Sequence, residues 1–273
     1  MENAVVRLIM RPPSDALRLA LSGHPDRDRI DPERAWAEHA AYVRALEESR
    51  VAVTLLPPEA DMPDACFTWD TVLAFPRLGD ARAALLVAAR PGAPSRRPEV
   101  ASVLACARRL APGAEVVEIL DPGTLDGGDV ITYGSRVAIG VSARTNEAGA
   151  RQLANAVCRI GYHAFLCPVE DRLHLASAIT PLRAQRLIGT QSGFQSLDAA
   201  GPEAAPDDVE RLLIPDGAVG GTNVLAAGGR CFVARGFPEA VAALVSAGES
   251  VVEVELDEFL FADGGPTCLV API

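Results

Sequence analysis

Short apolar segments alternate with longer amphipathic segments along the whole chain. The short segments are rich in Val, Ile, Leu and Ala and are bounded by Gly, Pro, Asp or Asn, a pattern that is typical of buried strands. We therefore predict strands at residues 5–10, 51–56, 71–76, 83–89, 114–120, 130–133, 137–141, 164–169, 174–180, 186–190, 223–227, 230–234 and 250–256.

The amphipathic segments between these strands predict helices. Asp31 can cap the first helix and Pro32 can occupy its first turn, positions that both residue types favour. The preceding residues, 12–30, are polar and rich in Asp and Arg, and we predict a mobile loop there. Helices are predicted at residues 31–49, 97–110, 146–160, 207–212 and 238–247.

A common module recurs along the chain, in which two strands joined by a tight turn precede a helix and a third strand. The turn at Gly134 and Arg136 recurs at Gly228 and Arg230. Five ββαβ-like modules of about 50 residues predict a closed α/β fold built from repeats. A doubly wound parallel sheet is the alternative, and it predicts single strands that alternate with helices. No segment has the composition of a linker, so we predict one domain over residues 1–273.

Composition and charge narrow the possible partners. With 49% apolar residues the chain can bury a substantial core, and its net charge of −11 includes no lysine. Such an acidic chain has no general attraction for nucleic acids or anionic membranes, whereas a cationic substrate suits it. The N-terminal residues lack the pattern of a secretory signal, and no apolar run reaches the roughly 18 residues of a membrane span. We therefore predict a cytoplasmic protein.

Six cysteines are spread along the chain without a C-x-x-C pair, which favours reduced thiols over disulfides. Cys268 follows Gly264, Gly265 and Pro266 on a predicted sharp turn. Glycine can adopt backbone angles closed to other residues and proline restricts its own φ, so this turn can present the thiol to a substrate. The alternative is that Cys268 is a small buried side chain beside a C-terminal strand, as most free cysteines are.

Acidic residues precede several of the predicted strands. Asp64 and Asp70 flank an otherwise apolar segment before one strand, and Asp126 and Asp129 enclose a Gly-Gly pair before another. Asp64 can serve a turn, but an acid at a strand entry, such as Asp70, is unusual. Acids beside glycines repel phosphate, so we reject a nucleotide-binding loop at the second segment.

Histidine and arginine add further candidates. His174 lies between two leucines at the start of a predicted strand, where it is either a catalytic residue or a core residue with satisfied hydrogen bonds. Arg96 and Arg144 each lie on a loop that leads into a predicted helix. Such arginines are usually solvated, but a planar guanidinium on a loop is also suited to bind a carboxylate.

In their order along the chain, these segments closely resemble the dimethylarginine dimethylaminohydrolases, which belong to the guanidine-modifying enzymes of the five-bladed α/β-propeller (pentein) fold. The resemblance runs from near Arg11 to the C-terminus. Its motifs are individually short, but they occur in the same order as in the family. They are Phe67 with Asp70, Ser95-Arg96-Arg97-Pro98-Glu99, Leu125-Asp126-Gly127-Gly128-Asp129, Ser142-Ala143-Arg144-Thr145-Asn146, Leu173-His174-Leu175 and Asp263-Gly264-Gly265-Pro266-Thr267-Cys268.

The resemblance implies a cysteine hydrolase that needs no metal and no cofactor, as a monomer or homodimer. Cys268 would be the nucleophile, His174 the general acid and base, and Asp126 its acidic partner. The substrate would be an Nω-methylated arginine, converted to L-citrulline and a methylamine through a covalent S-alkylthiouronium intermediate. Residues 22–30 would form a lid.

The resemblance also implies residues that bind this guanidino amino acid. Asp70 would hold the guanidinium nitrogens and Asp64 the α-amino group. Arg96 and Arg144 would bind the carboxylate, and Asp263 belongs to the same set of substrate-binding residues.

Trp69 is the main departure from the family pattern, which usually has Glu-Asp where this chain has Trp69-Asp70. One carboxylate would be lost from the cation pocket, and an indole would be added there as a further substrate-binding residue. A cation–π contact contributes about 0.5–2 kcal/mol, against about 1.5–3 kcal/mol for a hydrogen bond to a charged group. The preferred guanidino substituent is therefore open.

Other functions remain consistent with the pattern. Related guanidine-modifying enzymes act as arginine deiminases or amidinotransferases, although both are typically longer chains. The ribosome anti-association factor shares the fold without being an enzyme, and it lacks a combination of Cys, His and acid. A zinc site at Cys268, His174 and Asp126 is a further possibility, which no clustered spacing of ligands supports.

Overall fold

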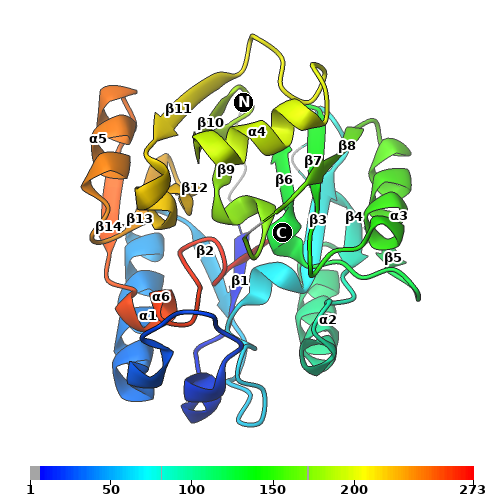
Figure 1. Ribbon diagram of the computed structural model, residues 1–273. Helices are drawn as coiled ribbons and strands as arrows, with labels where there is room; N and C mark the ends of the chain where they lie inside the picture. The colour runs from blue at the N-terminus through cyan, green and yellow to red at the C-terminus, as the bar shows by residue number, and fades with distance from the viewer. Residues whose placement is uncertain (1–6, 81, 171) are drawn as a thin grey trace.

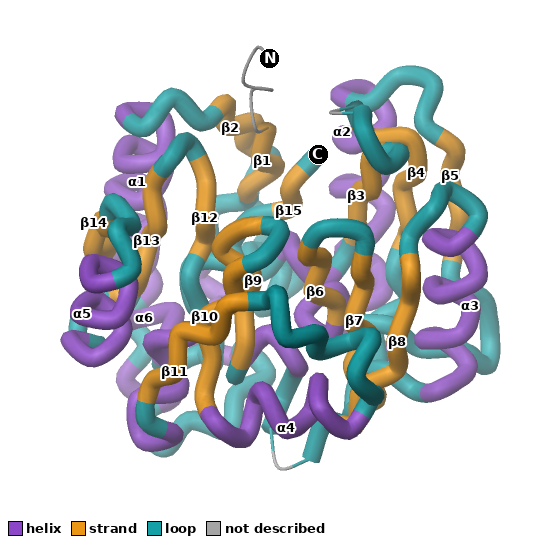
Figure 2. The backbone as a smooth tube through the Cα atoms, turned by 90° about the horizontal axis from the view of Figure 1, so that it is seen from above, coloured by secondary structure: helices purple, strands orange, loops and turns teal. Residues whose placement is uncertain are grey.

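The computed structural model describes residues 7–80, 82–170 and 172–273. Within them the chain forms five three-stranded sheets arranged in a ring (Figures 1 and 2), which is a five-bladed α/β-propeller. The predicted closed fold of ββαβ-like modules is confirmed, and the alternative of a doubly wound parallel sheet is wrong.

Each blade has the same internal topology. An inner strand pairs antiparallel with a middle strand, a helix follows, and an outer strand returns parallel to the middle strand. The large helices lie on the outside of the ring (Figure 2). Four blades are continuous in sequence: β3 (Val72–Pro76), β4 (Ala83–Ala88), α2 (Val100–Leu110) and β5 (Glu115–Glu118); β6 (Val130–Tyr133), β7 (Arg136–Val141), α3 (Glu147–Cys158) and β8 (His163–Pro168); β9 (Ile179–Arg183), β10 (Arg186–Thr190), α4 (Gln191–Ala199) and β11 (Glu210–Ile214); β12 (Leu225–Ala227), β13 (Arg230–Ala234), α5 (Pro238–Ser246) and β14 (Val251–Val254).

The two ends of the chain together build the remaining blade. Strand β1 (Arg7–Met10) pairs parallel with β2 (Ala52–Leu55), and α1 (Pro32–Glu48) connects them. On its other edge β1 pairs antiparallel with β15 (Ala271–Pro272), which takes the place of the inner strand. The ring is therefore closed by the C-terminal strand, which follows a short helix, α6 (Asp257–Leu260), and the turn that carries Cys268.

Local sequence signals explain where several elements begin. The Asp31 carboxylate accepts hydrogen bonds from the N–H groups of Glu33 and Arg34, which confirms the predicted helix cap. Gly134 and Gly228 both adopt a φ of 57° in the β6–β7 and β12–β13 turns, a conformation that side chains disfavour. The repeated glycine in the sequence therefore marks equivalent turns of two blades.

The predicted helix at 207–212 is wrong. The helix of this blade is α4, which begins after Thr190, whose Oγ1 accepts a 3.1 Å hydrogen bond from Gly193 N. Residues Glu210–Ile214 instead form β11, which pairs parallel with β10. This pairing joins segments that are distant in sequence, so the local pattern of apolar residues does not reveal it.

Some other boundaries also differ from the prediction. The strand predicted at 174–180 starts only at Ile179, because Leu175–Ser177 forms a 3-10 turn whose first N–H donates to Asp129 Oδ1 at 3.0 Å. The first two residues of the strand predicted at 5–10 lie outside the described residues. Residues 12–30 contain two short 3-10 helices rather than only irregular loop.

Apolar residues fill the interfaces between helices and sheets and between blades. One cluster, for example, packs Val103 and Cys106 of α2 against Leu86 of β4 and Ile9 of β1. Among the described helices, none is long and apolar enough to cross a membrane.

Candidate active site

Loops at one end of the propeller bring seven of the predicted residues to a single pocket. Inner and middle strands are antiparallel, so the start of each inner strand lies at the same end as the end of each middle strand. The predicted acids, His174 and Cys268 precede inner strands, whereas Arg96 and Arg144 follow middle strands. The pocket is lined by Asp64, Asp70, Arg96, Arg144, His174, Asp263 and Cys268, together with Leu21, Phe67, Leu173, Ala262 and Gly264.

Asp70 is the buried anion of this pocket. Its Oδ1 accepts a 2.7 Å hydrogen bond from Gly128 N, and its Oδ2 accepts one of 2.6 Å from Arg96 Nη1. Burial raises the pKa of Asp70, but His174, Arg96 and the Gly128 N–H outweigh burial and lower the pKa below its usual value. Asp70 is therefore ionised and can attract a cation into the pocket.

Arg96 uses most of its hydrogen-bond donors within the protein. Its Nε and Nη2 contact the Glu99 carboxylate, with a shortest distance of 2.9 Å, and Nη2 also donates to the carbonyl oxygens of Asp64 and Phe67. With Nη1 bound to Asp70, at most one of the five guanidinium N–H groups is free. The structure thus places Arg96 as a support for Asp70 rather than as a free carboxylate receptor.

His174 and Asp126 form a buried pair. His174 Nε2 lies 3.1 Å from Asp126 Oδ2, while Asp126 Oδ1 accepts a 2.8 Å hydrogen bond from Gly92 N. Burial alone would lower the pKa of His174, but Asp70, Asp126 and Asp129 together raise it to about 9. His174 is therefore protonated at neutral pH and can donate a proton to a group in the pocket.

The glycines of the site allow close packing. A Cβ on Gly128 would lie 2.5 Å from His174 Nδ1, and a Cβ on Gly264 would lie 2.3 Å from the Phe67 ring. We predicted that special backbone angles of Gly264 and its neighbour bend the turn before Cys268. The positive φ of this turn, 57°, belongs instead to Asp263.

Cys268 is partly exposed on this turn. Burial raises the pKa of its thiol and Asp70 raises it further, while hydrogen bonds from the Gly265 backbone and from the side chains of Asn223 and Thr267 act in the opposite direction. The thiol is therefore predominantly neutral in the empty pocket. A cation bound beside Asp70 would offset the negative charge and favour the thiolate.

Arg144 is the second arginine side chain that lines the pocket. Its Nη1 is buried, lies 3.5 Å from Asp126 Oδ2 and has no hydrogen-bond partner in the part of the chain that the structure describes. This contact with Asp126 is an ion pair without a hydrogen bond, so the guanidinium borders the pocket with an N–H group that is free to donate to an anionic group of a ligand.

Asp64 and Asp263 hold the segment that covers the pocket. Asp64 Oδ1 accepts a 3.0 Å hydrogen bond from Leu21 N. Asp263 Oδ2 accepts hydrogen bonds from Gly23 N at 2.6 Å and from Ser22 Oγ at 3.0 Å. The predicted mobile loop is thus anchored by two of the predicted substrate-binding carboxylates.

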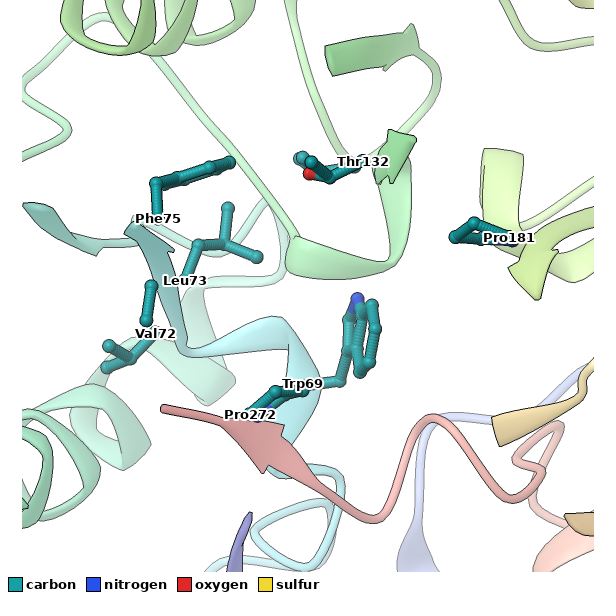
Figure 3. A pocket seen from close by; sticks show the side chains of 9 residues that line it. Trp69, Val72, Leu73, Phe75, Thr132, Pro181 and Pro272 are labelled. Carbon is teal, nitrogen blue, oxygen red and sulfur yellow. The ribbon is translucent and has the colours of Figure 1, made fainter. Parts of the chain in front are cut away.

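Trp69 does not line this pocket. Its Nε1 donates a 2.7 Å hydrogen bond to the Gly127 carbonyl, and only its backbone N–H reaches the Cys268 carbonyl, at 3.2 Å. Figure 3 shows the indole turned toward a separate apolar cavity of about 170 Å³. That cavity is lined by Trp69, Val72, Leu73, Ala74, Phe75, Val130, Thr132, Pro181 and Pro272. The structure therefore contradicts the added bulk and the cation–π contact that we expected in the cation pocket.

Asp70, Asp126 and His174 are also close enough to hold a metal ion, with one ligand atom from each lying within 4.8 Å of the others. Cys268 is not part of this group, contrary to the zinc site considered above. The two carboxylates already bind N–H groups of the protein, and a histidine must be neutral to bind a metal. With a pKa of about 9, His174 fits proton transfer better than metal binding.

Asn223 is a neighbour of the thiol that the sequence analysis missed. It precedes the inner strand β12, the position from which other blades contribute Asp70, Asp126 and His174. The Gly220-Gly221 pair before it is the signal that could have identified it.

Comparisons with known proteins give independent information on the family of this chain. The family model described as arginine deiminase matches residues 109–165. The N(G),N(G)-dimethylarginine dimethylaminohydrolase of Streptomyces coelicolor is 34% identical over 96% of this chain and 95% of its own length. The enzyme of the same name from Pseudomonas aeruginosa is 31% identical over 98% of both chains.

Solved structures give the same result. A dimethylarginine dimethylaminohydrolase adduct with S-methyl-L-thiocitrulline has a TM-score of 0.86 and 30% identity, covering 98% of this chain and 99% of the other. A Cys-to-Ser mutant of the Pseudomonas aeruginosa enzyme, complexed with citrulline, has a TM-score of 0.86 and 29% identity over 99% and 100% of the two chains. This chain therefore belongs to the dimethylarginine dimethylaminohydrolase family of hydrolases that act on carbon–nitrogen bonds of amidines.

Proposed function

We propose that this protein hydrolyses Nω-methylated arginines to L-citrulline and a methylamine, with Cys268 as nucleophile. The observation that carries the proposal is the arrangement of one pocket, where Cys268 and the His174–Asp126 pair surround the anion Asp70. Two enzymes named for dimethylarginine align with nearly the whole chain, at 34% and 31% identity, and this similarity supports the choice of substrate.

The substrate's guanidinium would bind at the acidic side of the pocket. Asp70 is ionised and held by Arg96, so its carboxylate can keep the guanidinium charged and oriented, while Asp126 contacts His174. Fixing the cation beside the sulfur also favours the thiolate, because it neutralises the charge of Asp70. The guanidinium carbon would then face Sγ.

Arg144 would bind the substrate's carboxylate. Its buried Nη1 forms an ion pair with Asp126 but no hydrogen bond, so it can still donate to an anion, and a pairing of guanidinium with carboxylate is strong in a partly buried site. Arg96 would act indirectly by holding Asp70. Asp64 and Asp263 would bind either the α-amino group of the substrate or the covering segment, whose N–H groups already donate hydrogen bonds to both carboxylates.

In the first half-reaction the Cys268 thiolate attacks the guanidinium carbon. A tetrahedral adduct forms, and protonated His174 transfers its proton to the substituted nitrogen as the C–N bond breaks. A neutral methylamine leaves and an S-alkylthiouronium remains on Cys268. The pKa of about 9 suits His174 to this acid role at neutral pH.

In the second half-reaction the neutral His174 acts as a base. It removes a proton from a water molecule, whose oxygen attacks the thiouronium carbon. The C–S bond then breaks, which regenerates the thiolate, and the second proton of the water passes to solvent, where it protonates the released amine, so that the neutral ureido group of L-citrulline remains. His174 is protonated again, so one water is consumed for each amine released.

The segment over the pocket must open for a substrate to enter. The closed pocket leaves a volume of about 20 Å³, which is room for about one water molecule. Leu21 lines the pocket, and its segment is attached by hydrogen bonds to Asp64 and Asp263, the carboxylates that a substrate would also contact. We propose that residues 22–30 form the predicted lid.

Hydrolysis of arginine itself is the second candidate, since the arginine deiminase family model matches part of the chain. The test is to incubate the purified protein with asymmetric dimethylarginine, monomethylarginine, arginine and agmatine. Citrulline and the released amine or ammonia are then quantified. We expect methylated arginines to be the best substrates, and preference for arginine would favour the second candidate.

Arg144→Ala should raise KM for methylated arginines by about 10- to 150-fold, which corresponds to the loss of one hydrogen bond between charged groups, about 1.5–3 kcal/mol. Agmatine lacks a carboxylate, so its already poor turnover should not decline further. Steady-state kinetics on both substrates would measure this, with Arg230→Ala as a control on an exposed arginine. Equal losses for agmatine and methylarginine would contradict the carboxylate-binding role.

A further inference from the structure

Asn223 approaches the thiol of Cys268 from another blade. Its Nδ2 lies 3.5 Å from Cys268 Sγ. The residue ends the 3-10 segment Asp216–Thr222 and lies just before β12. No step of the reaction described above uses this amide.

The orientation of the Asn223 amide follows from its contacts with Thr267. The backbone N–H of Thr267 and its Oγ1 both lie 2.9 Å from the same side-chain atom of Asn223. A backbone N–H can only donate, so this atom must be the carbonyl oxygen Oδ1. The NH₂ group must therefore face the sulfur of Cys268.

The backbone that carries Asn223 is firmly held. The fully buried Thr222 donates from Oγ1 to the carbonyl oxygens of Ser177 and Val219, at 2.9 and 2.8 Å. On the other side, a Cβ on Gly265 would lie 2.7 Å from Cγ of Asn223, so the amide packs directly on the turn that carries the cysteine. The amide can hardly turn away from Cys268 without disturbing that packing.

We propose that Asn223 is a positioning residue for the nucleophile, which holds the Cys268 turn through Thr267 and donates an N–H to the thiolate. This inference rests on the proposed function of Cys268. A thiolate accepts an N–H donor more strongly than a thiol does, so the contact should favour ionisation. The hydrogen bond from Asn223 should stabilise the thiolate before it attacks the substrate, and again when the sulfur leaves in the second half-reaction.

Other charged and titratable groups also face the sulfur, and they must stay unchanged in a test. Asp70 disfavours the thiolate, and Tyr42 donates from its hydroxyl to the Pro266 carbonyl beneath the turn. The remaining titratable groups that line the pocket are Asp64, Arg96, Arg144, His174 and Asp263. None of them forms a direct hydrogen bond with the Asn223 side chain among the contacts described.

Two substitutions test the contact. Asn223→Asp keeps an oxygen for both Thr267 donors and keeps the shape of the side chain, but it replaces the NH₂ group by oxygen and adds a negative charge beside the sulfur. Asn223→Ala removes both functions. Asn155→Asp makes the same chemical change at an exposed position of α3 and serves as the control.

The measurement is the rate at which iodoacetamide alkylates Cys268 as a function of pH, followed by peptide mass spectrometry. We expect the midpoint of this profile to rise by about one pH unit in Asn223→Ala, the shift for a tenfold loss of thiolate stabilisation, and by more in Asn223→Asp, whose carboxylate also repels the thiolate. In the control it should not move. Cys158, an exposed thiol on α3, gives an internal reference in every sample. The kcat/KM values should fall at neutral pH and partly recover at higher pH.

A folded Asn223→Ala variant with the wild-type midpoint would overturn the inference, whatever its turnover. If neither variant folds, Asn223→Ser adds no charge and has no NH₂ group, so it must raise the midpoint; an unchanged midpoint would then refute the inference. Thr267 stays unchanged throughout, because its own side chain also hydrogen-bonds to Cys268. A failure of the proposed function looks different, because the wild type would release no citrulline from any guanidino compound while its alkylation profile still depended on Asn223.

Discussion

Cys268→Ser reduces turnover of methylated arginines by at least about four orders of magnitude in our account. A serine hydroxyl offers no low-pKa anion. His174 already carries a proton at neutral pH because its pKa is about 9, and the carboxylate of Asp70 is too weak a base to ionise a hydroxyl. Steady-state citrulline production measures this loss. The dissociation constant for the substrate, from calorimetry, should change by no more than a few-fold, because the ion pairs that bind it remain.

Cys158→Ser is the matched control for this variant, because Cys158 is exposed on α3 and distant in the fold. It should retain full activity. Substantial turnover by Cys268→Ser, in a preparation free of wild-type enzyme, would remove Cys268 from the mechanism and leave only the fold and family assignments.

His174→Ala should lower kcat by about three to four orders of magnitude, because the same side chain protonates the departing amine and later activates water. The exposed His163 provides the control, and His163→Ala should be unaffected. Near wild-type turnover by His174→Ala would show that His174 is only a core residue.

The pH dependence gives an independent signature of His174. As pH rises through about 9, the acid form of His174 is lost, so wild-type kcat should fall there. The stability of the folded protein should fall over the same pH range as kcat. A pKa raised in the folded state contributes stability that is complete below about 6.5 and disappears as pH rises through about 9. Both changes should be absent in His174→Ala.

The fold could be predicted because each blade repeats the same pattern locally. Apolar strands, the capped helix at Asp31 and the glycine turns at Gly134 and Gly228 are all encoded in short segments. The one misplaced helix arose where the long connection at 200–209 separates α4 from β11. The parallel pairing of β11 with β10 decides that region, and it depends on tertiary contacts.

The topology of the fold predicts that the site residues lie close together in space. Because Asp70, Asp126 and His174 each precede an inner strand, a propeller must collect them at one end. The roles of individual side chains need their actual directions. A sequence does not show that Trp69 turns toward a separate apolar cavity, or that the hydrogen-bond donors of Arg96 are occupied by Glu99 and Asp70.

Asn223 illustrates the limit of residue type as a signal. An amide attracts less attention than an acid or a histidine, and only the two hydrogen bonds from Thr267 reveal how it is oriented. Its position before an inner strand is nevertheless the same as that of the acids, so the repeat could have singled it out.

The most direct measurement of the central claim is the intact mass of a covalent adduct on Cys268. S-methyl-L-thiocitrulline is a suitable reagent because methanethiol leaves without the proton that an amine requires. In His174→Gly we expect a stable mass increase equal to the reagent minus methanethiol, located by peptide mapping on Cys268. In the wild type this adduct should be transient, because His174 activates the water that removes it. An unmodified protein in both cases, or a label on Cys158 alone, would contradict the account.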